Sequence, residues 1–347
     1  MPAASRSACG SAVANLRAVT AGIARGASVG LLSTACALLA TLAPAAAAAP
    51  SERPEPPTKA AFRDSTRELL ADPAFRRSPE AILRRGSGSA PAQGEGAIFP
   101  ERRAVTLYGA PQLTATALGK RTPRGAARKI LEQAEPYRRF GDREVVPGFD
   151  LIGVVATASP GADRKYRSRQ PDEVIAEYLA EAREFGGRLV LDLQPGRSSV
   201  LNEVDALRPW LKQPDVDLAI DPEWNVSRRG VPGRTQGTID ASELNRVSKE
   251  LNRIVRRQGL PPKLMVVHQF RRGSIRHRRR IVQRTGVTAT LNFDGIGSPA
   301  AKEAGYVELA RRRLYNGFSV FYDLDSRVMK PRSVLELMPE VDFLLYQ

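Results

Sequence analysis

Short apolar runs alternate with helix-like stretches from residue 101 to the C-terminus of this 347-residue chain. The runs are continuously apolar, as expected of parallel strands that are buried on both faces. Between them, apolar residues recur at helical spacing, as at Leu244, Val247, Leu251 and Val255. The pattern predicts eight strands, at residues 104–109, 149–156, 188–193, 216–220, 263–269, 287–292, 318–322 and 341–346.

The stretches between these strands predict seven helices. Thr122-Pro123, Pro171-Asp172 and Ser298-Pro299 are typical helix starts, because proline is tolerated in the first helical turn. Asp240 and Glu243 have the spacing of a capping pair at the start of a fourth helix. The remaining three are predicted at residues 201–211, over the basic stretch 274–284 and around residues 334–337.

Eight strands that alternate with helices match the α/β class and, within it, the (β/α)8 barrel. The alternative is an open, doubly wound sheet. Such a sheet commonly carries a glycine-rich phosphate-binding turn, and no G-x-G-x-x-G sequence follows any predicted strand. We therefore predict a barrel domain at residues 101–347 that lacks an obvious eighth helix. A helical arm at residues 59–85 would cover the vacant position.

The first fifty residues have the composition of a secretory signal. They contain three arginines and no acidic residue, followed by an apolar stretch and an alanine-rich end. We predict a signal peptide at residues 1–50, cut near Ala49, and a secreted or envelope-associated protein. The alternatives are a retained membrane anchor, for which the apolar run is short, and a lipoprotein attached at Cys36. Residues 51–100 are rich in proline and glycine, which predicts an arm and linker with short helices.

The chain is strongly basic. Its formal net charge of +16 falls to +13 when the three arginines of the predicted signal are removed. A basic exported protein attracts anionic partners, although arginines also simply solvate helix faces. No nucleic-acid-binding motif is present, so nucleic acid is not expected as a partner. We predict a monomer without a membrane span after processing, whose partner is a glycan or an anionic cell-wall polymer.

Polar and aromatic side chains follow nearly every predicted strand. In a parallel barrel the carboxyl ends of the strands form one rim, where active sites lie. Asp221 and Glu223 share one face after the fourth strand, and Asp192 lies near the end of the third. We predict these three as catalytic residues. The predicted substrate-binding residues are Tyr108, Gln194, Trp224, His268, Gln269, Asn292, Asp294, Tyr322, Asp323 and Tyr346.

The residue types at this rim restrict the chemistry. The chain has only two histidines, which excludes a multi-histidine zinc site. Nucleophile-elbow and P-loop sequences are absent. An oxygen-only site for Mg²⁺ or Ca²⁺ is an alternative use of the carboxylates, but we expect no metal and no cofactor. Carboxylates with aromatic rings and amides fit glycoside cleavage, which uses a protonated acid and a second carboxylate. A structural alternative is that Asp221 and Glu223 cap the next loop and pair with Arg228, Arg229 or Arg234.

The segment Leu-Ala-Ile-Asp-Pro-Glu-Trp-Asn at residues 218–225 resembles the D-x-E motif on strand four of barrel glycosidases, such as Chalaropsis-type muramidases and chitinase-like enzymes. The resemblance implies that Glu223 is the general acid and that Asp221 positions it or the acetamido group of the substrate. Pro222 is unusual within the motif, and the long acidic run of chitinases is missing before Asp221. The chain from Arg103 onward is also similar to exported actinobacterial proteins of unassigned function, through residues 107–109, 191–198, 221–224 and 266–270.

The sequence thus predicts an exported barrel that acts on a cell-envelope or extracellular glycan by carboxylate acid/base catalysis. Two alternatives stay open at this point. One is a carbohydrate- or wall-binding barrel without catalysis, and the other is a metal-dependent phosphoesterase.

Overall fold

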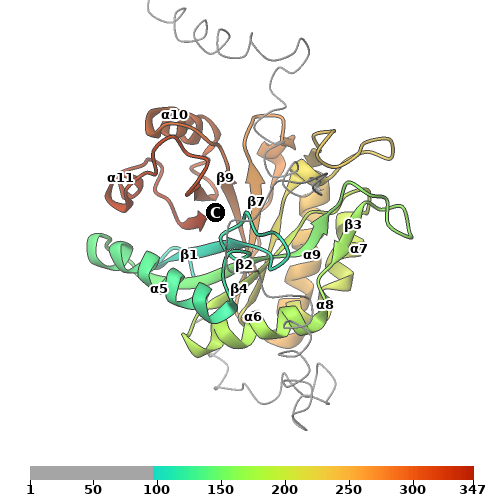
Figure 1. The fold of residues 1–347 in the computed structure, drawn as a ribbon, viewed down its shortest axis with the longest axis horizontal. Helices are drawn as coiled ribbons and strands as arrows, with labels where there is room; N and C mark the ends of the chain where they lie inside the picture. The colour runs from blue at the N-terminus through green and yellow to red at the C-terminus, as the bar shows by residue number, and fades with distance from the viewer. Residues whose placement is uncertain (1–96) are drawn as a thin grey trace, which may run out of the picture.

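The computed structural model describes residues 97–347 and contains a closed barrel of eight parallel strands (Figure 1). In spatial order the ring runs β1, β2, β4, β5, β7, β9, β10, β11, and it closes where β11 pairs with β1. The predicted barrel is therefore confirmed, while the expected signal peptide and arm lie outside the described residues. The bounds are β1 Arg102–Gly109, β2 Glu144–Ala156, β4 Arg188–Leu193, β5 Val216–Ile220, β7 Lys263–Gln269, β9 Val287–Phe293, β10 Tyr315–Val320 and β11 Phe343–Tyr346.

Helices lie around the strands on the outside of the barrel (Figure 1). They are α5 Pro123–Phe140, α6 Asp172–Glu184, α7 Val200–Ala206, α8 Arg208–Leu211, α9 Ala241–Gln258, α10 Pro299–Leu309 and α11 Pro331–Leu335. The expected caps are present: the side chains of Thr122, Asp240 and Ser298 each accept a backbone N–H of the first turn. None of the helices within residues 97–347 is long and apolar enough to cross a membrane.

The helix predicted at residues 274–284 was wrong. This segment holds the short strand β8 (Ile275–Arg276), which pairs with β6 (Ile239–Asp240), and the 3₁₀ turn η2 (Arg278–Arg280). A helix here would stack arginines four residues apart, and like charges at that spacing repel. Side chains instead hold the extended segment, because Asn245 binds the backbone of Arg280 and Val282.

A further strand outside the ring, besides β6 and β8, was also not predicted. Strand β3 (Arg167–Arg169) pairs antiparallel with the last residues of β2 and extends the sheet beyond the barrel. It is anchored by the fully buried carboxylate of Glu203, which accepts from Arg167 at 2.9 Å and from Arg169 at 2.7 Å. Because β3 pairs only with the end of β2, its antiparallel pairing does not interrupt the parallel ring.

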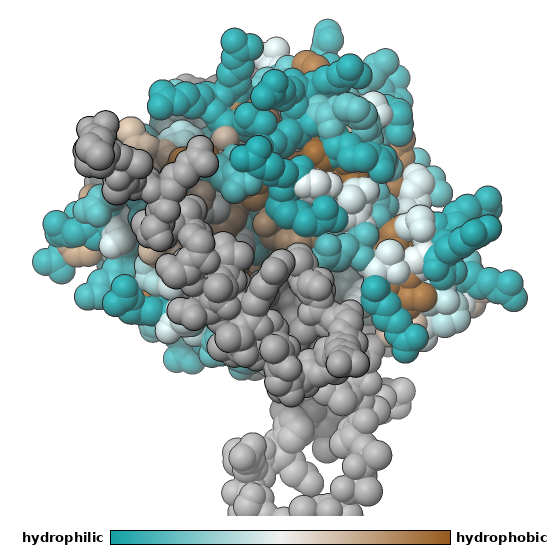
Figure 2. Space-filling model, turned by 90° about the horizontal axis from the view of Figure 1, so that it is seen from above, coloured by the Kyte–Doolittle hydropathy of each residue, from teal (hydrophilic) through white to brown (hydrophobic). Residues whose placement is uncertain are grey.

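Side chains alternate between the interior of the barrel and the helix layer, as the pleat of each strand requires. The interior cluster is apolar, and Ile98 and Phe99 belong to it although they precede β1. The Phe99 ring lies 5.1 Å from the ring of Tyr315, the first residue of β10, so this segment fills the amino-terminal end of the barrel. The outward-facing cluster packs against the helices, and hydrophilic side chains predominate on the face shown in Figure 2.

Replacing Phe99 by alanine tests whether this segment closes the barrel. Phe99 is 3 % exposed, so we expect Phe99→Ala to lower the free energy of unfolding by about 3–5 kcal/mol, as for other buried phenylalanines. Phe140→Ala is the matched control, because that side chain is 44 % exposed and should cost much less. Equal midpoints of the two variants in chemical denaturation would contradict the proposed packing role of Phe99.

Candidate functional site

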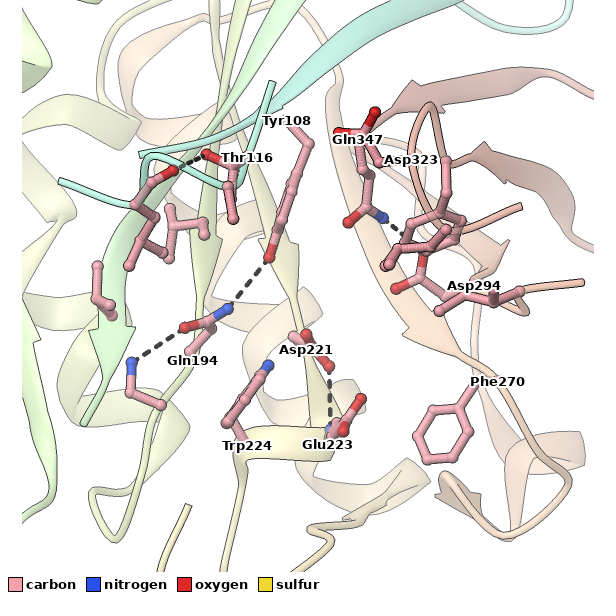
Figure 3. A pocket seen from close by; sticks show the side chains of 18 of the residues that line it. Tyr108, Thr116, Gln194, Asp221, Glu223, Trp224, Phe270, Asp294, Asp323 and Gln347 are labelled. Carbon is pink, nitrogen blue, oxygen red and sulfur yellow. Dashed lines mark hydrogen bonds between the residues drawn. The ribbon is translucent and has the colours of Figure 1, made fainter. Parts of the chain in front are cut away.

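A pocket of about 490 Å³ lies at the carboxyl-terminal end of the barrel strands. Seven of the predicted site residues line it, namely Tyr108, Gln194, Asp221, Glu223, Trp224, Asp294 and Asp323. In Figure 3 the first five lie on one side of the pocket, and Asp294 and Asp323 lie on the other with Phe270 and Gln347. The carboxyl ends of the strands therefore surround a concave pocket.

A hydrogen-bonded chain holds Tyr108 in the wall of the pocket. Its hydroxyl accepts from Gln194 Nε2 at 3.1 Å and donates to Asp192 Oδ2 at 3.2 Å. Gln194 Oε1 in turn accepts the backbone N–H of Ala156 at 3.0 Å (Figure 3). The phenol is thus oriented by β4 and by the end of β2, and its ring faces the pocket.

A short turn after β5 positions Asp221 and Glu223. The strand ends at Ile220, and the 3₁₀ turn η1 (Pro222–Trp224) begins with the proline, which has no N–H to donate to a ladder. Asp221 Oδ1 accepts the N–H of Glu223 at 3.0 Å and so caps the turn. Within residues 97–347, Asp221 forms no ion pair with Arg228, Arg229 or Arg234, so that part of the structural alternative is not observed.

The charge state of Asp221 depends on its depth in the barrel. Burial raises the pKa of its carboxyl well above the usual range, and the negative charges of Asp192, Glu223 and Asp294 raise it further, while His268 acts in the opposite direction. Asp221 therefore keeps its proton to higher pH than an exposed aspartate. One oxygen caps the turn, which leaves the other available to a ligand.

On the opposite wall, His268 and Asp294 form an ion pair. His268 Nδ1 lies 3.2 Å from Asp294 Oδ2, and Gln347 Nε2 donates to the second oxygen of Asp294 at 2.8 Å. Burial opposes charge on both groups, yet their attraction outweighs it: the pKa of His268 is raised well above its usual value and that of Asp294 is lowered. Asp294 is thus an ionised carboxylate with one face toward the pocket.

Asp192 lies beneath the pocket rather than in its wall. It is fully buried, its Oδ1 has no hydrogen-bond partner, and His268 Nε2 is 3.9 Å from that atom. Burial raises the pKa of Asp192 to about 6 despite the opposing effects of His268 and the Tyr108 hydroxyl. Its position fits an electrostatic role, since it reaches the pocket only through Tyr108 and His268.

Asp150 is a member of this cluster that the sequence analysis missed. It lies within β2, is 0 % exposed, and neither carboxyl oxygen has a hydrogen-bond partner. Burial, and then the charge of Asp192, raise the pKa of Asp150 well above its usual range, although His268 lowers it. Asp150 lies inside β2 and not at its end, so a prediction based on strand ends does not include it. The available signal was a single acid inside an apolar strand, where an unpaired charge is costly.

Five other predicted binding residues lie away from the pocket surface. His268 and Asn292 are buried beneath it, and Asn292 Nδ2 donates to Ser319 Oγ at 2.8 Å. The last three pack in the helix layer, because their backbone phase points them outward: Gln269 binds the carbonyl of Leu309, Tyr322 binds Gln133, and the hydroxyl of Tyr346 is 2.6 Å from that of Tyr137. Four residues that were not predicted also line the pocket, namely Lys120, Phe270, Phe321 and Gln347.

The carboxylates are not arranged as a metal site. Within residues 97–347, no group of three or more His, Cys, Asp or Glu side chains is placed to hold a metal ion. The metal-dependent phosphoesterase alternative therefore has no ligand set in the described part of the chain.

Replacing Asp192 by asparagine tests the cost of its burial. The pKa of about 6 in the folded state, against 3.8 for a free aspartate, means that the folded state binds the proton more tightly. The free energy of unfolding should therefore fall by up to about 3 kcal/mol as pH rises from about 4 to 6. We expect Asp192→Asn to be more stable than wild type at about pH 8 and similar to it at about pH 4, as measured by denaturant unfolding.

Asp142→Asn is the matched control for this experiment, because the Asp142 side chain is 78 % exposed. It should leave the pH dependence of stability unchanged. A loss of stability in Asp192→Asn at about pH 8 would instead show that the ionised carboxylate stabilises the fold.

The chain was also compared with known proteins. No protein-family model matches it, and no curated protein is similar to it at a significant level. What the pocket does must therefore be argued from its own geometry and chemistry.

Proposed function

We propose that the protein is an exported, glycoside hydrolase-like barrel that acts on a cell-envelope or extracellular glycan. The observation that carries the proposal is the turn at residues 221–224, which puts two neighbouring carboxylic acids and an indole into the wall of one pocket. The pocket volume of about 490 Å³ is in the range of sites for small ligands. Export rests on the composition of residues 1–50.

In this proposal Glu223 is the general acid that protonates the leaving glycosidic oxygen. Asp221 assists it, because its side chain holds the backbone N–H of Glu223 and because its second oxygen is available to the substrate. Cleavage of this kind also requires a carboxylate that stabilises the positive charge that develops on the sugar ring, or that activates water. Asp294 suits this second role, since it faces the pocket from the other wall and His268 keeps it ionised (Figure 3).

Aromatic side chains support a sugar as the ligand. Trp224, Phe270 and Tyr108 line the pocket and offer apolar ring faces for the carbon face of a sugar. Gln194 and Gln347 add amide groups that can bind hydroxyls, as the chemistry of carbohydrate recognition requires. A carbohydrate-binding barrel without catalysis would use these same contacts, so turnover has to be measured directly.

Replacing Glu223 by glutamine separates the two functions. The amide keeps the shape of the side chain but cannot donate a proton to the leaving group, so we expect turnover to fall by about 10²–10⁴-fold while glycan binding survives. Asp221→Asn should also lower turnover. The assay measures new reducing ends after incubation of the purified protein with peptidoglycan, chitin, and α- and β-glucan fragments.

Glu303→Gln is the control variant, because Glu303 is exposed on α10 and does not line the pocket. It should behave like wild type in the same assay. Cleavage that persists unchanged in Glu223→Gln would remove Glu223 from the role of acid. Binding of a glycan fragment without any cleavage by the wild type would favour the non-catalytic barrel.

A further inference from the structure

The charge of the pocket is opposite to that of the protein. The whole chain carries a formal charge of +16, yet the acidic side chains Asp221, Glu223, Asp294 and Asp323 line the pocket. Lys120 is the basic residue among the lining side chains, and it forms an ion pair with Asp323. The inner part of the pocket therefore holds acids without a basic side chain in its surface.

Beneath this surface, hydrogen-bond acceptors outnumber donors. Both oxygens of Asp150, Oδ1 of Asp192 and Oδ1 of Asn292 are buried and have no partner among residues 97–347, against one unpartnered nitrogen in the cluster, Nε2 of His268. Two cations among residues 97–347 act on the four aspartates Asp150, Asp192, Asp221 and Asp294. They are His268, which pairs with Asp294, and Lys302, which pairs with Asp325 and also lowers the pKa of Asp294. Asp150, Asp192 and Asn292 do not line the pocket, but Asp221 does; it is 7 % exposed, and one of its oxygens caps the turn. A positively charged ligand rich in donors would therefore bind the second oxygen of Asp221.

We propose that the pocket binds a glycan with a free, protonated amino group, that is, an N-deacetylated amino sugar, whose ammonium lies between Asp221 and Asp294. This inference rests on the proposed function and names the class of its substrate. An ammonium has three donors and no acceptor, which suits a pocket that presents carboxyl groups from two walls, Asp221 on one and Asp294 on the other (Figure 3). An acetamido group brings one N–H and no charge to the same place.

Two other kinds of cation fit the site less well. A metal ion would need three ligands placed around it, and no such group occurs within residues 97–347. A linear polyamine would satisfy the acids but would leave the ring faces of Trp224 and Phe270 without a partner of their own shape. An amino sugar can pair its ammonium with the acids and stack its ring on the aromatic faces of the pocket.

The proposal is consistent with the charge states of the pocket acids. Burial raises the pKa of Asp221, and the charges of Asp192, Glu223 and Asp294 add to that effect because too few cations offset them. An ammonium placed beside these groups would favour their ionised forms. The ligand would thus supply the positive charge that the barrel interior lacks.

The test compares two tetrasaccharides of equal length, one of glucosamine and one of N-acetylglucosamine. Isothermal titration calorimetry uses Glu223→Gln protein, so that neither sugar is consumed, at about pH 6 and physiological ionic strength. A hydrogen bond to a charged group contributes about 1.5–3 kcal/mol, so we expect the glucosamine oligomer to bind at least about tenfold more tightly. Non-specific attraction cannot produce this preference, because the basic protein repels the cationic oligomer.

Asp294→Asn, added to the same protein, should remove most of the preference, while Glu303→Gln should leave it unchanged. Asp221→Asn is the second variant, because Asp294 also pairs with His268 and its loss could unfold the site. Equal or tighter binding of the N-acetylated oligomer would overturn the inference and leave the proposed glycan function standing. Failure of both oligomers to bind would overturn the inference, and absence of cleavage or binding of every glycan would also overturn the proposed function.

Discussion

The ion pair between His268 and Asp294 is the contact on which the chemistry of the barrel interior depends. His268 is the cation that faces four buried aspartates, and its charge lowers the pKa of Asp150, Asp192, Asp221 and Asp294 alike. Asp294, Asp192 and Asp221 maintain the charge of His268 against the cost of burial. The protonation states of the cluster are therefore set jointly, and no single residue can be changed without affecting the others.

The barrel makes this concentration of acids structurally tolerable by separating it from the apolar interior. Ile98, Phe99 and the inward-facing apolar residues of the strands fill the amino-terminal part, and the polar side chains follow toward the carboxyl ends. Asp150 and Asp192 still have unpaired oxygens in a fully buried position, which lowers stability. Buried acids with such perturbed surroundings are characteristic of binding and catalytic sites.

The turn after β5 shows how a local sequence sets the geometry of the pocket wall. Pro222 stops the ladder, Asp221 caps the turn that follows, and Glu223 is held by the N–H that Asp221 accepts. Asn225 fixes the exit of the turn, because its side chain binds the carbonyl of Thr238. Two adjacent acids thus differ in surroundings: Asp221 is 7 % exposed, whereas Glu223 is only partly buried.

The sequence alone determined the class of fold, the approximate bounds of the strands and seven of the residues that line the pocket. These properties follow from local periodicity, from capping residues and from the rule that parallel strands place their carboxyl ends at one rim. Tertiary structure decided which rim residues share a pocket. Gln269 and Tyr346 have the right position along the chain, but their side chains point into the helix layer. Asp150 lies within β2, and the pairing of β2 with β4 and the curvature of the barrel bring it near Asp192 and His268. The charges of these groups depend on burial and on neighbours that are distant in sequence, which no local pattern encodes.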